Sequence, residues 1–332
     1  MKTPFTKQWN PVSGCTPEFL GCANCTAQRT SKSLAGRFGY SKLNPFDVTQ
    51  HAGKLQQPLS WKKPQRVEVC SMGDLFNPKV TKEYIASVFA VMAACPQHSF
   101  LVSTRSVERA KEWFAWVYAR EADGRELFPH DTPSWRIWQM LRSYAGKAGC
   151  SLPEHHGGKW PLPNVWLGTS VENQENADIQ LPVLNKIPAV GHFVQVSPLI
   201  NAVDLKANVW KLDWVICSGE LGKYARPMHP YWVDWLQEQC GVAKVPFFFT
   251  SWGEWGLRSS GKNPDDKGVG VRLSFDGKHS SSDEPAFGVP GCGNGKEDVW
   301  LGRVGAKNTR SLLGEPACQE IPARLVCYAG GA

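Results

Sequence analysis

The sequence lacks the features that mark several large classes of protein. It has no run of eighteen apolar residues, so a membrane span is not expected. Its first residues lack the apolar stretch of a secretion signal. Eleven cysteines without an export signal argue against a disulfide framework and for a reducing cytoplasm, where we expect this protein to reside.

Several catalytic signatures are missing as well. The chain has no Walker loop, and no strand-turn-helix signature of a Ser-His-Asp site. Its histidines have no metal-ligand spacing: His155 and His156 stand without spaced partners, and His229 precedes Pro230 at the start of a predicted helix. The net charge of +7 favours polyanionic partners only mildly. Fifteen Trp and fifteen Phe could either stack on bases or pack in the core.

What the chain does have is a cluster of three cysteines near its start. Cys15, Cys22 and Cys25 follow the spacing C-x6-C-x2-C. Three thiolates can hold a four-iron cluster by three of its irons and leave the fourth iron free for a ligand. A structural zinc would need a fourth protein ligand. His51 is the best candidate for that ligand, but it lies far from the cysteines in sequence.

Short apolar segments alternate with amphipathic ones through most of the chain, which predicts a parallel sheet covered by helices. With one strand before the cysteines, about seven strand–helix units result, which fits a partial (β/α) barrel better than a small open sheet. The predicted strands are 66–70, 99–103, 164–169, 192–196, 213–217 and 245–250, and the predicted helices are 81–94, 106–117, 175–185 and 230–240.

Two segments break this alternation. The insertion at about 120–163 is long for a connector and is expected to cover the cavity or to contact DNA. Residues 256–332 are rich in Gly, Ser and Lys, and predict a loop-rich basic extension with short hairpins, whose segments 300–305 and 310–313 dock onto the body. The barrel itself is assigned to residues 1–255.

Ligands of parallel β/α folds bind at the carboxyl ends of the strands, so we take the candidate site from those ends. The candidates for cofactor binding are Ser71, Asp74, Ser170, Glu172, Ser197, Gly219 and Glu220. The candidates for catalysis are Glu220, Glu254 and Cys217. A helix cap or a structural salt bridge is the alternative interpretation of the two glutamates. Cys217, like Cys70, Cys95 and Cys240, also fits a small buried apolar residue.

The sequence resembles a phage and bacterial three-cysteine family. The similarity runs from about residue 8 to 255 and returns in the basic segment 303–313. It is carried by the segments Trp9–Cys15, Gly21–Cys25, Gln57–Lys62, Ser71–Phe76, Trp166–Glu172, Asp213–Ile216, Gly219–Glu220, Ala225–Pro230, Val245–Phe249 and Trp252–Trp255.

That family is similar to radical S-adenosylmethionine (SAM) enzymes, which have a partial β/α barrel. The resemblance implies that Cys15, Cys22 and Cys25 bind three irons of a [4Fe-4S] cluster. It further implies that SAM binds the remaining iron, and that a flavodoxin or ferredoxin donates the electron. Some phage members resemble isomerases of thymidine hypermodification, which convert N-linked to C-linked glycyl-thymine in DNA and protect it from host restriction. The expected substrate is therefore DNA or a modified nucleobase, and a base within a duplex would have to be flipped out to be reached.

This chain departs from the family pattern in four places. The first cysteine gap is three residues longer than the usual C-x3-C-x2-C. The third cysteine is followed by Thr26-Ala27-Gln28 instead of Tyr-Ala-Glu. Gly-Gly-Glu-Ser-Gly becomes 218–222, Ser-Gly-Glu-Leu-Gly, and Lys-Arg-Pro becomes Arg105-Ser-Val. The cluster ligands are retained, so the departures concern the substrate and the details of SAM binding.

Two other functions are compatible with the residues alone. One is a nucleic-acid-binding protein without catalytic activity, in which the three cysteines and a remote ligand hold a structural zinc. The other is a redox protein whose cluster only transfers electrons. The incomplete ligand set and the polar strand ends favour a bound substrate over simple electron transfer.

Overall fold

The computed structural model describes residues 4–119, 133–152, 160–257, 270–281, 298–306, 309 and 318–326. His155 and His156 lie outside these residues, as do residues 310–313 of the basic segment.

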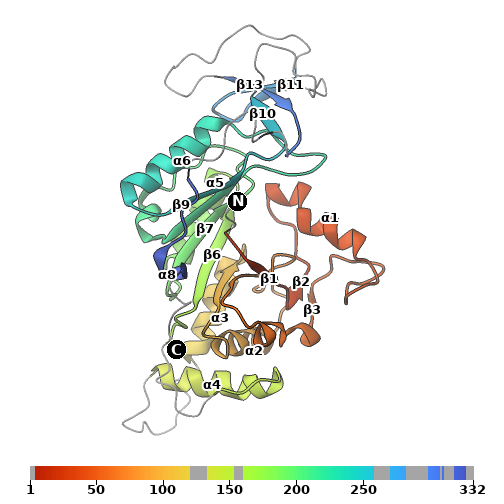
Figure 1. Ribbon diagram of the computed structural model, residues 1–332, viewed down its shortest axis with the longest axis vertical. Coiled ribbons are helices and arrows are strands. Elements are labelled where there is room, and N and C mark those ends of the chain that lie inside the picture. Colours follow the sequence, from red (N-terminus) through yellow and green to blue (C-terminus); the bar gives the residue numbers. More distant parts are fainter. Residues whose placement is uncertain are drawn as a thin grey trace.

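A parallel sheet of seven strands forms the body of the protein. Its strands follow one another in chain order and curl into a half-barrel (Figure 1). They are β1 (Lys7–Trp9), β4 (Arg66–Val69), β5 (Ser99–Ser103), β6 (Val165–Val171), β7 (His192–Val196), β8 (Trp214–Ser218) and β9 (Phe247–Ser251). Every neighbouring pair is parallel. The predicted α/β class and the partial barrel are confirmed.

Four helices connect the strands where the sequence predicts them. They are α2 (Lys82–Ala93), α3 (Val107–Ala119), α5 (Gln174–Leu184) and α6 (Pro230–Ala243). The side chain of Thr81 accepts a hydrogen bond from the Tyr84 N–H, and that of Asn173 accepts one from the Asn176 N–H. Each cap satisfies a backbone donor that the first turn leaves free. Helices α2 and α5 therefore both begin at a side-chain cap.

The sheet separates two apolar clusters. The larger cluster lies between the sheet and the helices, and it includes the fully buried Trp9, Trp113 and Trp232. The smaller cluster contains Leu101, Trp166, Phe193, Trp214, Ile216, Phe248 and Leu325. Side chains alternate along a strand, so Val194 and Val196 belong to the larger cluster while Phe193 belongs to the smaller one. Much of the aromatic content thus serves packing.

The described part of the insertion is a helix on the outside of the barrel. Helix α4 (Pro133–Lys147) packs against α2 and α3. Its residues Ile137, Trp138 and Leu141 are buried in the larger cluster. We therefore describe residues 133–152 as part of the outer helical layer.

The C-terminal region forms a second, antiparallel sheet. Its strands occur in the order β10 (Trp255–Leu257), β13 (Val299–Arg303), β11 (Gly270–Leu273) and β12 (His279–Ser281). Residues 318–320 then return to the half-barrel, where the Phe249 N–H donates to the Cys318 carbonyl and the Trp214 indole donates to the Glu320 carbonyl. Helix α8 (Ala323–Val326) follows, and its Leu325 joins the smaller cluster.

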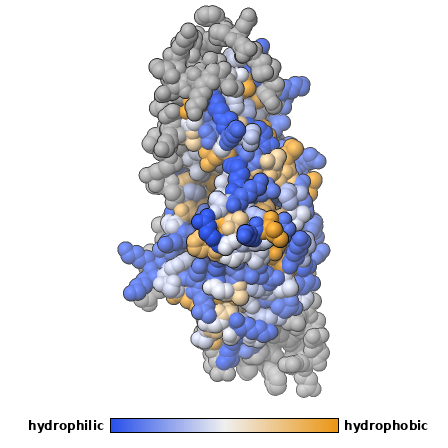
Figure 2. All heavy atoms as spheres, turned by 90° about the vertical axis from the view of Figure 1, so that its right-hand side faces the viewer, coloured by the Kyte–Doolittle hydropathy of each residue, from blue (hydrophilic) through white to orange (hydrophobic). Residues whose placement is uncertain are grey.

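Figure 2 looks at the side of the molecule that carries α1 (Thr26–Ser33) and the paired strands β2 (Val12–Ser13) and β3 (Thr49–Gln50). Hydrophilic residues cover most of this face, and hydrophobic residues form scattered patches. Among the described residues, no helix is long and apolar enough to cross a membrane.

Candidate functional site

The cysteine loop lies across the carboxyl ends of β1 and β4. Gly14 has a φ of 83°, and its N–H donates to the Met72 carbonyl. A Cβ at this glycine would lie 2.6 Å from the Phe46 carbonyl oxygen, so both the backbone conformation and the close approach require glycine. The chain then passes Cys15 and forms a short 3-10 helix, Leu20–Asn24, that carries Cys22. Cys25 ends the loop at the N-terminus of α1.

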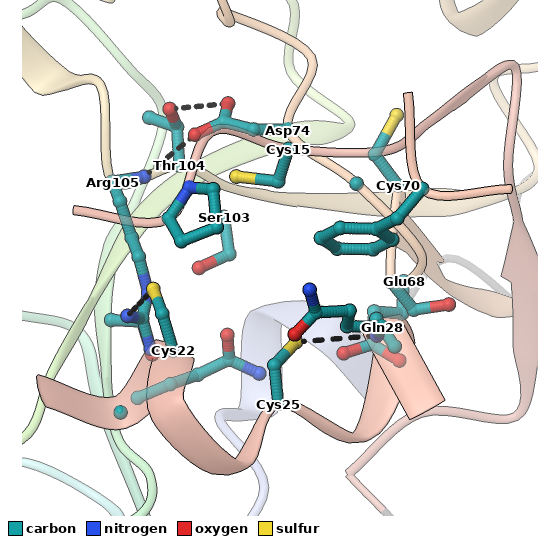
Figure 3. A pocket seen from close by; sticks show the side chains of 18 of the residues that line it. Cys15, Cys22, Cys25, Gln28, Glu68, Cys70, Asp74, Ser103, Thr104 and Arg105 are labelled. Atoms are coloured by element: carbon teal, nitrogen blue, oxygen red, sulfur yellow. Dashed lines mark hydrogen bonds between the residues drawn. The ribbon is translucent and has the colours of Figure 1, made fainter. Parts of the chain in front are cut away.

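All three cysteines line one cavity of about 190 Å³, here called the cysteine cavity. Their thiols are free, half-buried and directed toward a common space (Figure 3). Of the strand-end candidates, Ser71, Asp74 and Ser170 line the same cavity. The loop and the ends of β4, β5 and β6 thus meet at one place, as expected for a site at the carboxyl edge of a parallel sheet.

Two of the three sulfur atoms accept hydrogen bonds. The guanidinium of Arg105 donates to Cys22 Sγ at 3.4 Å, and the Gln28 backbone N–H donates to Cys25 Sγ at 3.5 Å. Burial, together with the nearby Asp74, raises the pKa of the Cys15 thiol to about 12. A thiol loses its proton when it ligates a metal, so metal binding at Cys15 would release one.

Arg105 joins the cysteine loop to a buried carboxylate. Its guanidinium forms an ion pair with Glu172, whose side chain is fully buried and also accepts from Asn176 Nδ2 at 2.6 Å. The guanidinium also lies 5.4 Å from the centre of the Phe19 ring. Burial raises the pKa of Glu172, and the Arg105 charge opposes this shift. Glu172 is therefore placed to anchor Arg105, and the contact of Arg105 with Cys22 is one that the sequence did not reveal.

Asp74 holds the ends of β4 and β5 together. One carboxylate oxygen accepts from Thr104 Oγ1 at 2.6 Å and from the Phe76 N–H at 2.9 Å. The other accepts from the backbone N–H groups of Arg105 at 3.0 Å and Ser106 at 3.3 Å. These bonds occupy most of its acceptor capacity, so Asp74 shapes the wall of the cavity.

The other predicted strand-end acids make structural contacts. Glu220 is buried and paired with Arg226, whose Nη2 lies 2.6 Å from Oε1 and whose Nε lies 2.8 Å from Oε2. Arg226 also donates to the Leu20 carbonyl at 3.2 Å, which ties the end of β8 to the cysteine loop. Glu254 accepts from the Gly222 N–H at 2.9 Å. Neither glutamate lines the cysteine cavity.

Three further candidates lie away from the cysteine cavity. Cys217 is fully buried in the larger apolar cluster, which gives it a packing role and removes it from contact with a ligand. Gly219 packs against the Trp252 backbone, where a Cβ would lie 2.5 Å from the carbonyl carbon. Ser197 bonds to Ser218, with 2.6 Å between their Oγ atoms, and lines a second cavity.

Several polar residues of the cysteine cavity were not predicted, and two of them are a charged and an amide residue inside strands. Glu68 and Gln195 lie within strands β4 and β7, and both line it. The available signal was a charged or amide residue inside an otherwise apolar strand, whereas the predicted candidates all came from strand ends. Cys70 also lines the cavity, but its thiol turns away from the other three in Figure 3.

The structure does not bring His51 to the cysteines. Its Nε2 lies 2.7 Å from Ser13 Oγ, its ring contacts Tyr40, and it is absent from the lining of the cysteine cavity. In the described part of the chain, no three His, Cys, Asp or Glu side chains stand close enough to hold one metal ion. A tetrahedral zinc needs such a group, whereas a cluster spreads its thiolates over several irons.

One family model covers nearly the whole chain. The model is DUF5131, described as a protein of unknown function, and it matches residues 3–322. The chain belongs to the DUF5131 family. No curated protein and no solved structure matches it. In this DUF5131 protein, the matched residues include the cysteine loop, the seven-stranded half-barrel and the described strands of the second sheet.

Proposed function

We propose that this protein is a radical SAM enzyme. The observation that carries the proposal is the convergence of three free thiols on one cavity at the carboxyl edge of a half-barrel. In the described part of the chain, no three His, Cys, Asp or Glu side chains stand close enough to hold a single metal ion, as a tetrahedral zinc would require. This donor set fits a [4Fe-4S] cluster that Cys15, Cys22 and Cys25 would hold.

When bound, such a cluster together with SAM supplies one-electron chemistry that ends in abstraction of a hydrogen atom from the substrate. The residues of this chain would hold and shield that group. Arg105 and the Gln28 N–H donate to two of the ligand sulfurs, and hydrogen bonds to sulfur are one of the factors that set a cluster's reduction potential. In the wall of the cavity, Ser71 and Ser170 would offer polar contacts to the cofactor, and Asp74 fixes the shape of that wall.

The substrate that we propose is a modified thymine base in phage DNA, and the reaction is an isomerisation of glycyl-thymine from N-linked to C-linked. The resemblance of the motifs to thymidine hypermodification enzymes supports this assignment. A net charge of +7 is compatible with a polyanionic substrate. A flavodoxin or a ferredoxin would supply the electron.

The experiment is anaerobic turnover of reconstituted protein with SAM and a reductant. We expect 5′-deoxyadenosine by liquid chromatography. With glycyl-thymine DNA as substrate, we expect a nucleoside of unchanged mass and altered retention. Detection of 5′-deoxyadenosine with no isomer in the DNA digest would reject the substrate alone. Its absence from iron-loaded protein would reject the radical SAM assignment.

Cysteine variants show which thiols are ligands. Cys→Ala at 15, 22 or 25 should each abolish the cluster and the product. Cys70→Ala tests a cysteine of the same cavity whose thiol points away, and it should retain iron. Cys150→Ala is a second control, because this free cysteine is half-buried and does not line the cavity. Full iron content in any of the first three variants would reassign the ligands.

A further inference from the structure

The concave side of the half-barrel changes from apolar to polar along its strands. The apolar part is the smaller cluster, with Trp166, Phe193 and Trp214 at its centre. Further toward the carboxyl ends of β7 and β8, the residues of the same strand face are Gln195 and Ser218, since side chains alternate with a period of two. A barrel interior that serves only packing is filled with branched apolar side chains. The polar side chains in this part of the half-barrel therefore indicate a ligand-binding site.

A second cavity, here called the lumen cavity, opens onto this polar zone. Its volume is about 670 Å³, within the usual range of small-molecule sites. Residues 4–8 form one wall of it, and the inner faces of β4, β7, β8 and β9 contribute most of the rest, with Ser197 and Leu221 just beyond the strand ends. Glu68 and Gln195 line both the lumen cavity and the cysteine cavity. A ligand in the lumen cavity that touches these two residues therefore lies directly beside the cysteine cavity.

Three polar side chains meet at this shared wall. Gln8 of β1 and Glu68 of β4 are partners in the parallel register, and Gln8 Nε2 donates to Glu68 Oε2 at 3.0 Å. Burial raises the pKa of Glu68, and its hydrogen bonds with Gln8 and Gln195 oppose that shift. Within the described residues, no Lys or Arg forms an ion pair with Glu68. A half-buried carboxyl group facing a cavity, with amides as its partners, is a candidate for ligand contact.

The chemistry of this wall selects the class of ligand. Each carboxamide offers both a donor and an acceptor, and a carboxyl group accepts as a carboxylate and also donates when protonated. An anion would be repelled by Glu68. An uncharged ring with adjacent N–H and C=O groups would satisfy the wall, and Phe5, Ile216 and Leu221 offer apolar contact to its faces. Enzymes that act on flipped bases read them in this manner, by hydrogen bonds to one edge and contact with the ring faces.

We propose that Gln8, Glu68 and Gln195 form the substrate-binding subsite, and that they bind the lactam edge of an uncharged heterocycle such as a pyrimidine base. As a substrate subsite this assignment rests on the proposed function, whereas the binding that it predicts can be measured by itself. The subsite places the ring on the concave face of the half-barrel, next to the three cysteines.

The first test uses two ligands on the reconstituted protein. Thymidine carries an N3–H between two carbonyl groups, and N3-methylthymidine differs only in that this donor is blocked. Isothermal titration calorimetry should show binding of thymidine, and binding of N3-methylthymidine that is roughly three- to tenfold weaker, the effect of one lost hydrogen bond. No binding of thymidine, or equal binding of both ligands, overturns the subsite.

The second test uses variants of the wall. Glu68→Leu should weaken thymidine binding by roughly three- to tenfold and remove the difference between the two ligands. Glu68→Gln retains hydrogen-bonding capacity and should bind thymidine within a few-fold of the unaltered protein. Glu112→Leu, at an exposed position of α3, is the control and should change nothing. Unaltered discrimination in folded Glu68→Leu protein contradicts the proposal, and if that variant does not fold, the two-ligand comparison decides.

Iron content and 5′-deoxyadenosine formation are measured on the same samples. If both are intact and thymidine binding fails, only the subsite is rejected. If thymidine is bound with the predicted discrimination by a protein that takes up no iron, the subsite stands and the radical SAM assignment is rejected.

Discussion

Gly21→Ala is the substitution that most sharply tests how the cysteine loop is held. Gly21 precedes Cys22 in the short helix that packs on the buried Glu172. A Cβ at position 21 would lie 2.9 Å from Glu172 Cγ and closer still to Oε1, whereas ordinary contact begins near 3.4 Å. The Glu172 side chain cannot shift away from the added methyl group, because it is fully buried and held by Arg105 and Asn176.

The added methyl group therefore has to push the loop off the sheet or break the contacts of Glu172. Overpacking of this kind costs about 1–3 kcal/mol of unfolding free energy. We expect a lower urea midpoint for Gly21→Ala and a loss of iron on anaerobic reconstitution, since Cys22 moves with the loop. Gly53→Ala is the matched control, because a Cβ there meets nothing within 4 Å. A Gly21→Ala protein with unchanged iron content and unfolding midpoint would refute the packing argument.

Three further substitutions have defined outcomes. Arg105→Lys keeps the positive charge, but its shorter side chain should withdraw the donor from Cys22, since a single nitrogen of Arg105, Nη1, contacts both Glu172 and Cys22. The lost hydrogen bond should lower the reduction potential of the reconstituted cluster by on the order of 50 mV in a redox titration, and an unchanged potential would refute that contact. Gly168→Ala places a Cβ 2.6 Å from Phe193 Cε1 and should cost about 1–3 kcal/mol in urea unfolding, unlike an exposed control such as Gly241→Ala. Burial lowers the pKa of His51 to about 4. Below pH 6.5 the unfolded chain then binds a proton that the folded chain does not, so the free energy of unfolding falls as the pH drops from 7 to 5, by no more than about 2 kcal/mol from this group. A His51→Gln protein should lose less of its free energy of unfolding over the same pH range. An equal loss would count against His51 as the titrating group.

The elements of the half-barrel could be predicted because their signals are local. Strands such as 99–103 and helices such as 230–243 are set by apolar periodicity and by caps within a few residues. The cysteine spacing is local in the same sense. Cys15, Cys22 and Cys25 stand close together in sequence, and the structure places them around one cavity.

The polar wall could not be predicted, because it depends on how the sheet curls. Gln8, Glu68 and Gln195 are far apart in sequence, and only the curvature from β1 to β7 brings them into one cavity. The residues that pair with the strand-end acids could not be predicted either, because they lie far away in the sequence or are brought into place by the geometry of a loop. Nothing in the sequence around Glu172 indicates its pairing with Arg105, which lies one strand earlier in the sheet.

The metal content of anaerobically reconstituted protein tests the central claim most directly. We expect about four irons and four sulfides per chain, because three free thiols that line one cavity suit a [4Fe-4S] cluster. A colourless protein that takes up one zinc per chain and no iron would contradict the account. It would favour instead the zinc-stabilised, nucleic-acid-binding alternative.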